Sequence, residues 1–366
     1  MTRVPALLTA LVLLAACSHD NGSAAPEEAA PRPTTRTASP VQPGRTGPVV
    51  VRTIASGLEV PWGVTFLPDG TALVGERDTT RVLAVSGRRV RAVGTVEQAS
   101  PQGEAGLLGL AASPSYVEDH LVYAYVSTAA DNRVVRMTYD GHALGEPEPV
   151  LTGIPNGFIH DGGRLLFAGD GSLFVSTGET GQPSLAQDPG SLAGKILHIT
   201  PEGEPAADNP TPGSPVWSMG HRNVQGLAFD ARGRLWATEF GDDTWDELNL
   251  IEPGGNYGWP LVEGAGDLAE YRNPFVTWST DDASPSGLAY LDGSLWAGAL
   301  RGERLWEIPL TRDGTASPRD WFVGSFGRIR TVTVAPDGNL WLTTSNRDGR
   351  GNPAPQDDRI LEVSVG

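Results

Sequence analysis

The stretch that decides the fold lies near the middle of the chain and reads Gly220-His221-Arg222-Asn223-Val224-Gln225-Gly226-Leu227-Ala228-Phe229. An Arg-Asn pair stands directly before an apolar run with the pattern of a half-buried strand. The turn Asp230-Ala231-Arg232-Gly233 comes next, and Arg234-Leu235-Trp236-Ala237 resumes the strand pattern. Two strands joined by a short polar turn predict a β-hairpin with a reactive polar pair at its entrance.

The same unit recurs along the chain at a spacing of about 40–60 residues, a period typical of propeller blades. Most copies contain an Asp-Gly pair or a similar turn, which two-residue hairpin loops favour. The six copies begin at Pro61, Glu104, His160, Arg222, Ser286 and Arg328. Further strand-like runs follow each hairpin, and no long helical periodicity is present. The sequence therefore predicts an all-β fold, a six-bladed β-propeller with four-stranded antiparallel blades.

Two features of the sequence are also compatible with a propeller of seven blades. The second copy is irregular, and residues 263–282 are long enough to hide extra strands, so a seven-bladed propeller is the alternative. The last strand-like run, Arg359-Ile360-Leu361-Glu362-Val363, is expected to join the first blade and close the ring. The 46 glycines and 30 prolines agree with a fold that has many turns.

The N-terminus has the features of an exported lipoprotein. Residues 1–16 contain an apolar run too short to cross a bilayer, as in a signal peptide. Leu14-Ala15-Ala16-Cys17 resembles the lipobox of bacterial lipoproteins, in which cleavage precedes a cysteine that receives a diacylglycerol. Residues 17–48, rich in Ala, Pro and Thr, are expected to form a disordered tether from the lipidated Cys17 to a propeller domain at 49–366. We therefore expect an extracytoplasmic protein, lipid-anchored to the outer face of the bacterial cytoplasmic membrane. The alternative is an ordinary signal peptide with a chance cysteine.

The polar residues at the entrances of the copies form the expected functional site. The innermost strands of a propeller surround a central channel, so the loops that enter them bring these residues to one mouth. They are Glu104, His160, Arg222, Asn223, Arg328 and Arg330, with Trp62 and Gln225 nearby. Buried arginines need anionic partners and Glu104 can pair with only one of them, so the cluster predicts an anionic ligand. His160 is suited to act as general base on a substrate hydroxyl, and a buried structural histidine is the alternative.

Three segments carry a resemblance to a known family. They are Gly220–Phe229, Asp246-Glu247-Leu248-Asn249-Leu250-Ile251 and Gly254-Gly255-Asn256-Tyr257-Gly258-Trp259-Pro260. With them the chain resembles, over about residues 50–365, the soluble sugar dehydrogenases that depend on pyrroloquinoline quinone (PQQ), the glucose/sorbosone or aldose sugar dehydrogenase family. The resemblance implies a quinoprotein oxidoreductase that oxidises an aldose at C1 to its lactone by hydride transfer to PQQ.

The resemblance also implies a role for each residue at the channel mouth. His160 is expected to take the proton of the sugar C1 hydroxyl, and Arg222 and Asn223 are expected to hydrogen-bond the quinone oxygen. Glu104 is expected beside the cofactor. The arginines expected to bind the cofactor carboxylates are Arg301, Arg328 and Arg330. Arginine suits this task because its planar fork binds carboxylates in a bidentate manner.

Calcium is implied by the same route. One Ca²⁺ is expected to bridge the cofactor and the backbone carbonyls of Gly241 and Asp242. A second is expected to bind the Glu247 carboxylate and the Tyr257 carbonyl. Oxygen ligands of this kind are the ones that Ca²⁺ prefers in proteins.

Three residues depart from the family pattern. Asp242 stands where a Pro may occur in the family, but only its carbonyl is required. Glu104 stands where some members have Gln, and its carboxylate is expected to repel the cofactor, to be protonated or to pair with an arginine. Ile159 stands where some members have an Asp that helps to set the base. These differences bear on rate and substrate more than on cofactor binding.

Two other functions stay open at this point: a non-catalytic binding module, and a Ca-dependent lactone or ester hydrolase. A binding module has no need of a base that faces an anion pocket. A hydrolase requires metal-binding carboxylates along the channel, where only Glu104 is found. The formal net charge of −17 argues against nucleic acid as a partner. The expected partners are a small-molecule sugar, an unspecified electron acceptor, and the membrane through the lipid anchor alone.

Overall fold

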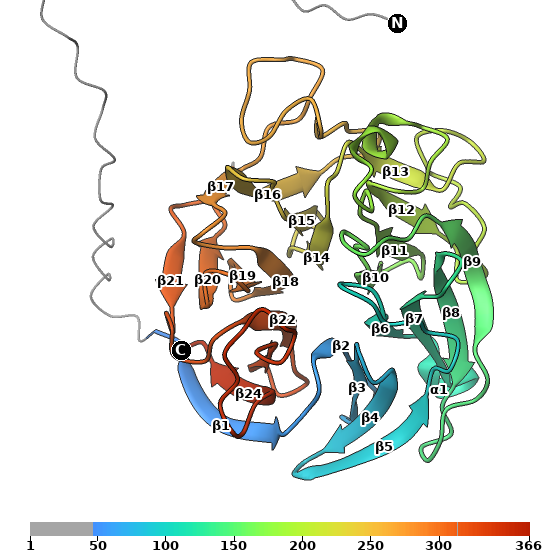
Figure 1. Ribbon diagram of the computed structural model, residues 1–366, viewed down its shortest axis with the longest axis vertical. Coiled ribbons are helices and arrows are strands. Elements are labelled where there is room, and N and C mark those ends of the chain that lie inside the picture. Colours follow the sequence, from blue (N-terminus) through green and yellow to red (C-terminus); the bar gives the residue numbers. More distant parts are fainter. Residues whose placement is uncertain (1–46, 313) are drawn as a thin grey trace, which may run out of the picture. The chain divides into compact units, whose positions relative to one another are not determined.

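The structure is a computed structural model, and it describes residues 47–312 and 314–366. Six four-stranded antiparallel sheets follow one another around a central axis (Figure 1). The predicted six-bladed propeller is confirmed, and the seven-bladed alternative is wrong. Within these ranges the helices are short, namely α1 (Tyr116–Asp119) and the 3₁₀ helix η1 (Pro183–Gln187). None of the helices in the described ranges has the length and apolar character needed to cross a membrane.

The first three sheets run outward from the axis in chain order. The first contains β2 (Pro61–Phe66), β3 (Ala72–Glu76), β4 (Arg81–Ser86) and β5 (Arg89–Thr95). The second contains β6 (Leu107–Ala112), β7 (Leu121–Ser127), β8 (Asn132–Thr138) and β9 (Glu148–Ile154). The third contains β10 (Leu165–Phe167), β11 (Leu173–Ser176), β12 (Lys195–Ile199) and β13 (Val216–Met219).

The fourth and fifth sheets repeat this order, and the sixth combines both ends of the domain. The fourth contains β14 (Val224–Phe229), β15 (Leu235–Glu239), β16 (Trp245–Ile251) and β17 (Val276–Ser279). The fifth contains β18 (Pro285–Leu291), β19 (Ser294–Ala299), β20 (Arg304–Pro309) and β21 (Arg319–Trp321). The sixth contains β22 (Ile329–Val334), β23 (Leu340–Thr344), β24 (Arg359–Ser364) and β1 (Val49–Ser56).

The ring closes in a different way from the one expected. β24 is the third strand of the sixth sheet, and β1 pairs with it as the outermost strand. The first sheet is already complete with β2 to β5, so the expectation that the last run joins the first blade is wrong. Residues 263–282 hold β17, the outer strand of the fourth sheet, rather than part of a further blade.

The hairpin turns use the recurring Asp-Gly pairs in two ways. In the fifth sheet Asp292 and Gly293 form the predicted two-residue loop, and both have positive φ, 50° and 80°. In the first sheet the loop is longer, and Gly70 takes the positive φ of 83°. There the Asp69 carboxylate accepts the Thr71 N–H at 2.8 Å. Aspartate therefore stabilises this turn through an Asx bond, in addition to the freedom that glycine supplies.

The apolar core lies between neighbouring sheets. Leu73 and Val82 of the first sheet, for example, share one cluster with Leu107 and Val122 of the second. The six innermost strands surround the axis and contact one another (Figure 1). Because the chain enters each of these strands at the same end of the ring, the six entering loops meet there.

Candidate functional site

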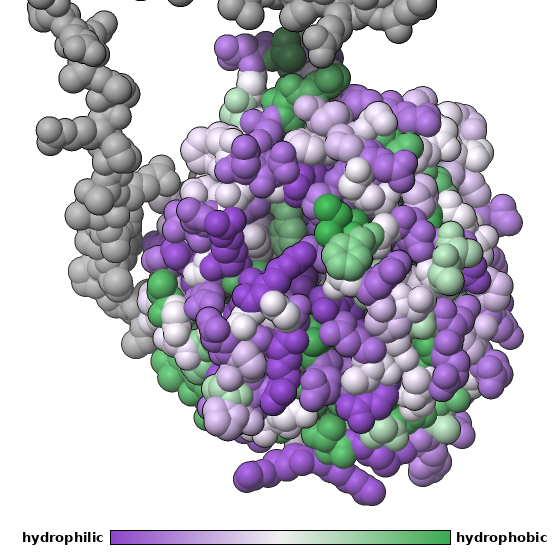
Figure 2. All heavy atoms as spheres, in the orientation of Figure 1, coloured by the Kyte–Doolittle hydropathy of each residue, from purple (hydrophilic) through white to green (hydrophobic). Residues whose placement is uncertain are grey.

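A cavity of about 470 Å³ lies where the entering loops meet. Hydrophilic side chains cover much of the centre of the ring in Figure 2. The predicted residues on the cavity wall are Glu104, His160, Arg222, Gly241, Asp242, Arg301 and Arg328. The size is within the range of sites that bind small molecules and cofactors. Glu104, His160, Arg222 and Arg328 were predicted from the repeat position, and Gly241, Asp242 and Arg301 from the family resemblance.

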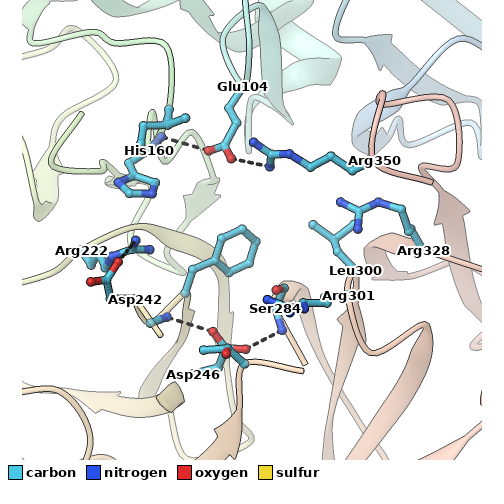
Figure 3. Close-up of a pocket in the computed structure, with 14 residues that line it drawn as sticks. Glu104, His160, Arg222, Asp242, Asp246, Ser284, Leu300, Arg301, Arg328 and Arg350 are labelled. Atoms are coloured by element: carbon cyan, nitrogen blue, oxygen red, sulfur yellow. Dashed lines mark hydrogen bonds and ion pairs between the residues drawn. The ribbon is translucent and has the colours of Figure 1, made fainter. Parts of the chain in front are cut away.

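His160 lies in the loop between β9 and β10 and is held from two sides. Its backbone is left-handed, with φ of 59°, which is uncommon for a residue other than glycine. The Glu104 carboxylate accepts its backbone N–H at 2.9 Å. The ring extends into the cavity (Figure 3), and its Nδ1 forms a short hydrogen bond with the Glu179 carboxylate. Because Glu179 occupies Nδ1, Nε2 is the nitrogen left to meet a ligand.

Glu179 supplies the carboxylate that is missing at Ile159. It follows β11, the second strand of the third sheet, and it is 1% exposed. Gly178 beside it has to be glycine, because a Cβ there would collide with the His160 carbonyl oxygen. Sequence reasoning missed Glu179 because it examined the entrances of the innermost strands and not the ends of the second strands.

Glu104 takes the third of the three expected forms, a carboxylate paired with an arginine. Its partner is Arg350, at 2.7 Å, from the loop between β23 and β24. Although burial raises the pKa of the Glu104 carboxyl, the His160 N–H and the Arg350 guanidinium bring that pKa below its usual value. Glu104 is therefore ionised with its charge compensated. Arg350 was not among the predicted residues.

The three remaining arginines lie at different depths. Arg328 lines the cavity, and its Nε and Nη2 both donate to one Asp348 oxygen at 2.9 Å. Arg330 lies deeper, donating to Gln225 Oε1 at 3.0 Å, and burial lowers its pKa to about 9. Arg301 is on the rim, where its side chain is 62% exposed and pairs with Asp281 at 2.6 Å.

Like Arg330, the predicted residues Trp62 and Asn223 are not on the cavity wall. Trp62 was expected at the channel mouth, but it is 2% exposed. Its ring lies 4.2 Å from the Arg164 guanidinium and 5.9 Å from that of Arg330, so it supports two cations inside the channel. Asn223 is fully buried, and its Oδ1 accepts the Gly162 N–H at 3.1 Å.

Three of the predicted site residues have a buried donor without a partner in the described part of the chain. Within the described part of the chain, Arg222 Nε, Asn223 Nδ2 and Arg330 Nε are buried and have no hydrogen-bond acceptor. Such donors are costly in a finished protein. A cofactor with several acceptor oxygens would satisfy them, so the residues present fit a group such as PQQ.

Three of the four predicted calcium ligands, Gly241, Glu247 and Tyr257, line a second, smaller cavity, whereas Asp242 lines the first one. Gly241 borders both cavities, and Asp242 forms an ion pair with Arg222 at 2.7 Å. The small cavity, of about 10 Å³, is also lined by Glu239, Glu247, Tyr257 and Glu263. Burial and the nearby Glu239 raise the pKa of Glu247. No group of three or more His, Cys, Asp or Glu placed to hold a metal is found in residues 47–312 and 314–366, and the calcium ions stay a prediction.

Comparison with known proteins adds independent information. A family model described as glucose/sorbosone dehydrogenase matches residues 58–352. The PQQ-bound structure of an aldose sugar dehydrogenase from Streptomyces coelicolor is 53% identical and covers 88% of this chain and 100% of its own, with a TM-score of 0.86. The aldose sugar dehydrogenase YliI of Escherichia coli is 28% identical over 82% of this chain and 91% of its own. Quinoprotein glucose dehydrogenase B of Acinetobacter calcoaceticus is 31% identical over 78% of this chain and 70% of its own.

Proposed function

The chain belongs to the glucose/sorbosone dehydrogenase family, and we propose that it is a quinoprotein that oxidises aldose sugars with PQQ as cofactor. The observation that carries the proposal is the set of unpartnered buried donors on Arg222, Asn223 and Arg330. Arg222 lines the same cavity as His160. The likeness to a PQQ-bound aldose sugar dehydrogenase supports it. We assign Arg222 and Asn223 to the quinone oxygen, and Arg328, Arg330 and Arg301 to the carboxylates.

The geometry around His160 suits proton transfer from the sugar. We propose that the C1 hydroxyl donates its proton to His160 Nε2 while C1 loses a hydride, so that the aldose becomes its lactone. Glu179 fixes the ring through Nδ1 and stabilises the imidazolium that forms. When bound, PQQ supplies the acceptor for the hydride.

Calcium belongs to the same proposal. We assign one Ca²⁺ to the carbonyls of Gly241 and Asp242 and a second to the Glu247 carboxylate with the Tyr257 carbonyl. Asn249, two residues along β16 from Glu247, has a buried Oδ1 without a partner in the described part of the chain. An unpartnered oxygen next to a buried carboxylate supports a cation in this region.

Turnover of an aldose panel tests the proposed function. The full-length protein is assayed with a dye acceptor, with and without added PQQ and Ca²⁺. We expect oxidation of aldoses that requires PQQ and is increased by Ca²⁺, with lactone as the product. Protein that binds PQQ, as seen by its absorbance, and still oxidises no aldose would contradict the proposal.

The exported form is a separate proposal, because residues 1–46 lie outside the described residues. We propose that residues 1–16 are a signal peptide and that the lipidated Cys17 anchors the propeller through the tether 17–48. The wild-type protein is then expected in the membrane fraction, and Cys17→Ser should release it or leave the signal uncleaved. Soluble wild-type protein without lipid by mass spectrometry would rule the anchor out.

A further inference from the structure

We propose that Lys195 is a positioning residue for the proposed base, acting through the loop that carries Glu179. Its ammonium occupies a cage formed by the backbone carbonyls of Leu185, Ala186 and Ala193. The inference rests on the proposed function and adds to it a cation that lies off the cavity wall, at the first position of β12 in the third sheet.

The Lys195 side chain lies entirely inside the protein. It is 0% exposed, and lysine is almost never buried to this degree without an ionic partner. Its Nζ donates to the carbonyl oxygens of Leu185 at 2.8 Å, Ala186 at 3.0 Å and Ala193 at 2.7 Å. In the described part of the chain no carboxylate forms an ion pair with it. An ammonium has three N–H donors, so the cage uses all of them.

The cage requires a positive charge. Three carbonyl oxygens that converge on one atom repel one another through their partial negative charges, and a cation between them offsets that repulsion. Burial lowers the pKa of Lys195 to about 8, so the ammonium is still charged at pH 7 despite the cost of desolvation. The same three oxygens are suited to a small monovalent cation such as ammonium itself.

Lys195 holds the loop of Glu179 at both ends. At the start of the loop the Lys195 N–H donates to Thr177 Oγ1, and the Thr177 N–H donates to the Lys195 carbonyl, both at 2.9 Å. At the far end the ammonium holds the carbonyls of Leu185 and Ala186 in η1. Glu179, whose carboxylate fixes the proposed base, lies between these two attachments. The position of that carboxylate therefore depends on both.

Hydrogen bonds inside the loop connect the cage to Glu179. The Leu185 N–H donates to the Gln182 carbonyl, and the Gln182 N–H donates to the Glu179 carbonyl, each at 2.9 Å. The Glu179 N–H in turn donates at 2.8 Å to the carbonyl of Arg222, at the entrance of the neighbouring fourth sheet (Figure 1). A shift of η1 would thus displace the carboxylate that orients His160. Misplacement of a catalytic group by about 1 Å can cost about 100-fold in rate.

The test compares Lys195→Met with a matched control, Ile199→Ala. Ile199 is also 0% exposed and belongs to the apolar core, but it stands at the other end of β12. For PQQ-loaded full-length proteins, kcat per bound quinone and KM are measured on an aldose that the wild type oxidises. We expect kcat to fall roughly 10–100-fold in Lys195→Met with KM nearly unchanged. Both should stay at the wild-type level in Ile199→Ala, although that variant is less stable.

A second variant tests the cage without turnover. Lys195→Ala leaves the three carbonyls facing a space that suits ammonium and is too small for tetramethylammonium. Ammonium chloride is expected to raise the Tm of PQQ-free Lys195→Ala, and to restore most of the lost kcat per bound quinone once PQQ is loaded. Tetramethylammonium chloride at the same concentration should do neither, and the wild type should respond to neither salt.

The remaining outcomes decide against the proposal. An unchanged kcat per bound quinone in Lys195→Met, or an equal loss in Ile199→Ala, reduces Lys195 to a contribution to stability. A rise in Tm with ammonium without recovery of kcat separates the cage from the base, and no response of either shows that the carbonyls need no cation. A PQQ-loaded wild type that oxidises no aldose removes the proposed function and the positioning role with it, while the Tm of Lys195→Ala still decides whether the cage binds a cation.

Discussion

At the scale of single residues, the site depends on how His160 is held. Its left-handed backbone is unfavourable for a side chain with a Cβ, by an amount of order 1–3 kcal/mol. The Glu104 carboxylate offsets part of this cost by accepting the His160 N–H, and Glu179 fixes the ring. The conformation is retained because two carboxylates from different loops act on one histidine. The orientation of the imidazole ring is therefore fixed by these two contacts.

Replacement of His160 by alanine separates its catalytic role from a structural one. We expect PQQ affinity to stay close to that of the wild type and the rate on aldoses to fall roughly 10²–10⁴-fold. In the proposed function the arginines hold the cofactor, whereas His160 contacts only the sugar hydroxyl. The measurement is turnover normalised to bound quinone. A structural histidine would instead lower cofactor occupancy and thermal stability while leaving the normalised rate unchanged.

Asp161, the next residue, predicts a pH dependence of stability. Asn132 Nδ2 donates to its Oδ1 at 2.9 Å, and its Oδ2 has no partner in the described part of the chain. Burial raises the pKa of its carboxyl to about 6. Since this value lies above the unfolded value of about 3.9, stability from this group is present at low pH and lost as the pH rises through 6.

Asp161→Asn removes this titration. The free energy of unfolding of the variant, relative to the wild type, should therefore increase between pH 5 and pH 7.5, by about 1.4 kcal/mol. Denaturant unfolding of both proteins at the two pH values measures the difference. A difference that does not depend on pH would show that the carboxyl titrates normally.

The sequence was most informative where the repeat places a polar residue at a strand entrance. Arg222 and Arg328 were found in this way because each stands just before a copy of the recurring strand pattern. Arg350 and Glu179 were not, because each lies in a loop that follows a second strand and has no counterpart in the repeat. Their roles depend on loop conformations that bring distant parts of the chain together, and strand periodicity carries no information about those.

At the scale of the elements, the sixth sheet shows what strand patterns leave undetermined. Alternation identified β24 as a strand but does not specify which neighbour a strand pairs with, and β1 was not among the predicted strands. β1 pairs with the sheet that lacks a fourth strand. Which sheet that is depends on how the whole ring closes. The Asp-Gly turns were likewise predicted in position, but the loop lengths were not: two residues join β18 to β19, whereas five residues, 67–71, join β2 to β3.

Strand β1 should be an important part of the fold because it completes the sixth sheet. Ile54 on this strand is 6% exposed and belongs to an apolar cluster with β23 and β24, so Ile54→Ala should reduce the free energy of unfolding by about 2–4 kcal/mol. Val51 on the same strand is 53% exposed, and Val51→Ala should change the free energy of unfolding by less than about 0.5 kcal/mol. Chemical denaturation distinguishes them. Equal, small effects would mean that β1 is only loosely attached.

At the scale of the whole molecule, the ring brings together arginine side chains that belong to different sheets. Arg222 comes from the fourth sheet, Arg330 from the sixth and Arg164 from the third. Mutual repulsion adds to burial in lowering the pKa of Arg164 to about 9. The closed ring therefore brings positive charge together at its axis, although the net charge of the whole chain is −17. Without an anionic ligand, this arrangement lowers the stability of the ring.

Cofactor binding should therefore stabilise the protein, and Arg330 should be central to that effect. Arg330 Nη2 lies 3.7 Å from Asp348, which keeps Arg328 as a closer partner at 2.9 Å, so Arg330→Met leaves no buried charge unpaired. The variant without cofactor is expected to be at least as stable as the wild type, since it loses a desolvated cation. Its PQQ affinity should fall by roughly 10–100-fold with the loss of a charge-assisted contact.

Thermal unfolding with and without PQQ, in the presence of Ca²⁺, measures both effects at once. A ligand at about 100 times its Kd stabilises the folded state by about 2.7 kcal/mol, so the wild type should show a clear rise in Tm. At the same PQQ concentration the rise should be much smaller in Arg330→Met and unchanged in Arg52→Met, a control in which the replaced side chain is 55% exposed on the outer strand β1. If PQQ raised the Tm of Arg330→Met as much as that of the wild type, the anionic groups would have to bind elsewhere. The unpartnered Nε of Arg330 would then not mark the cofactor site.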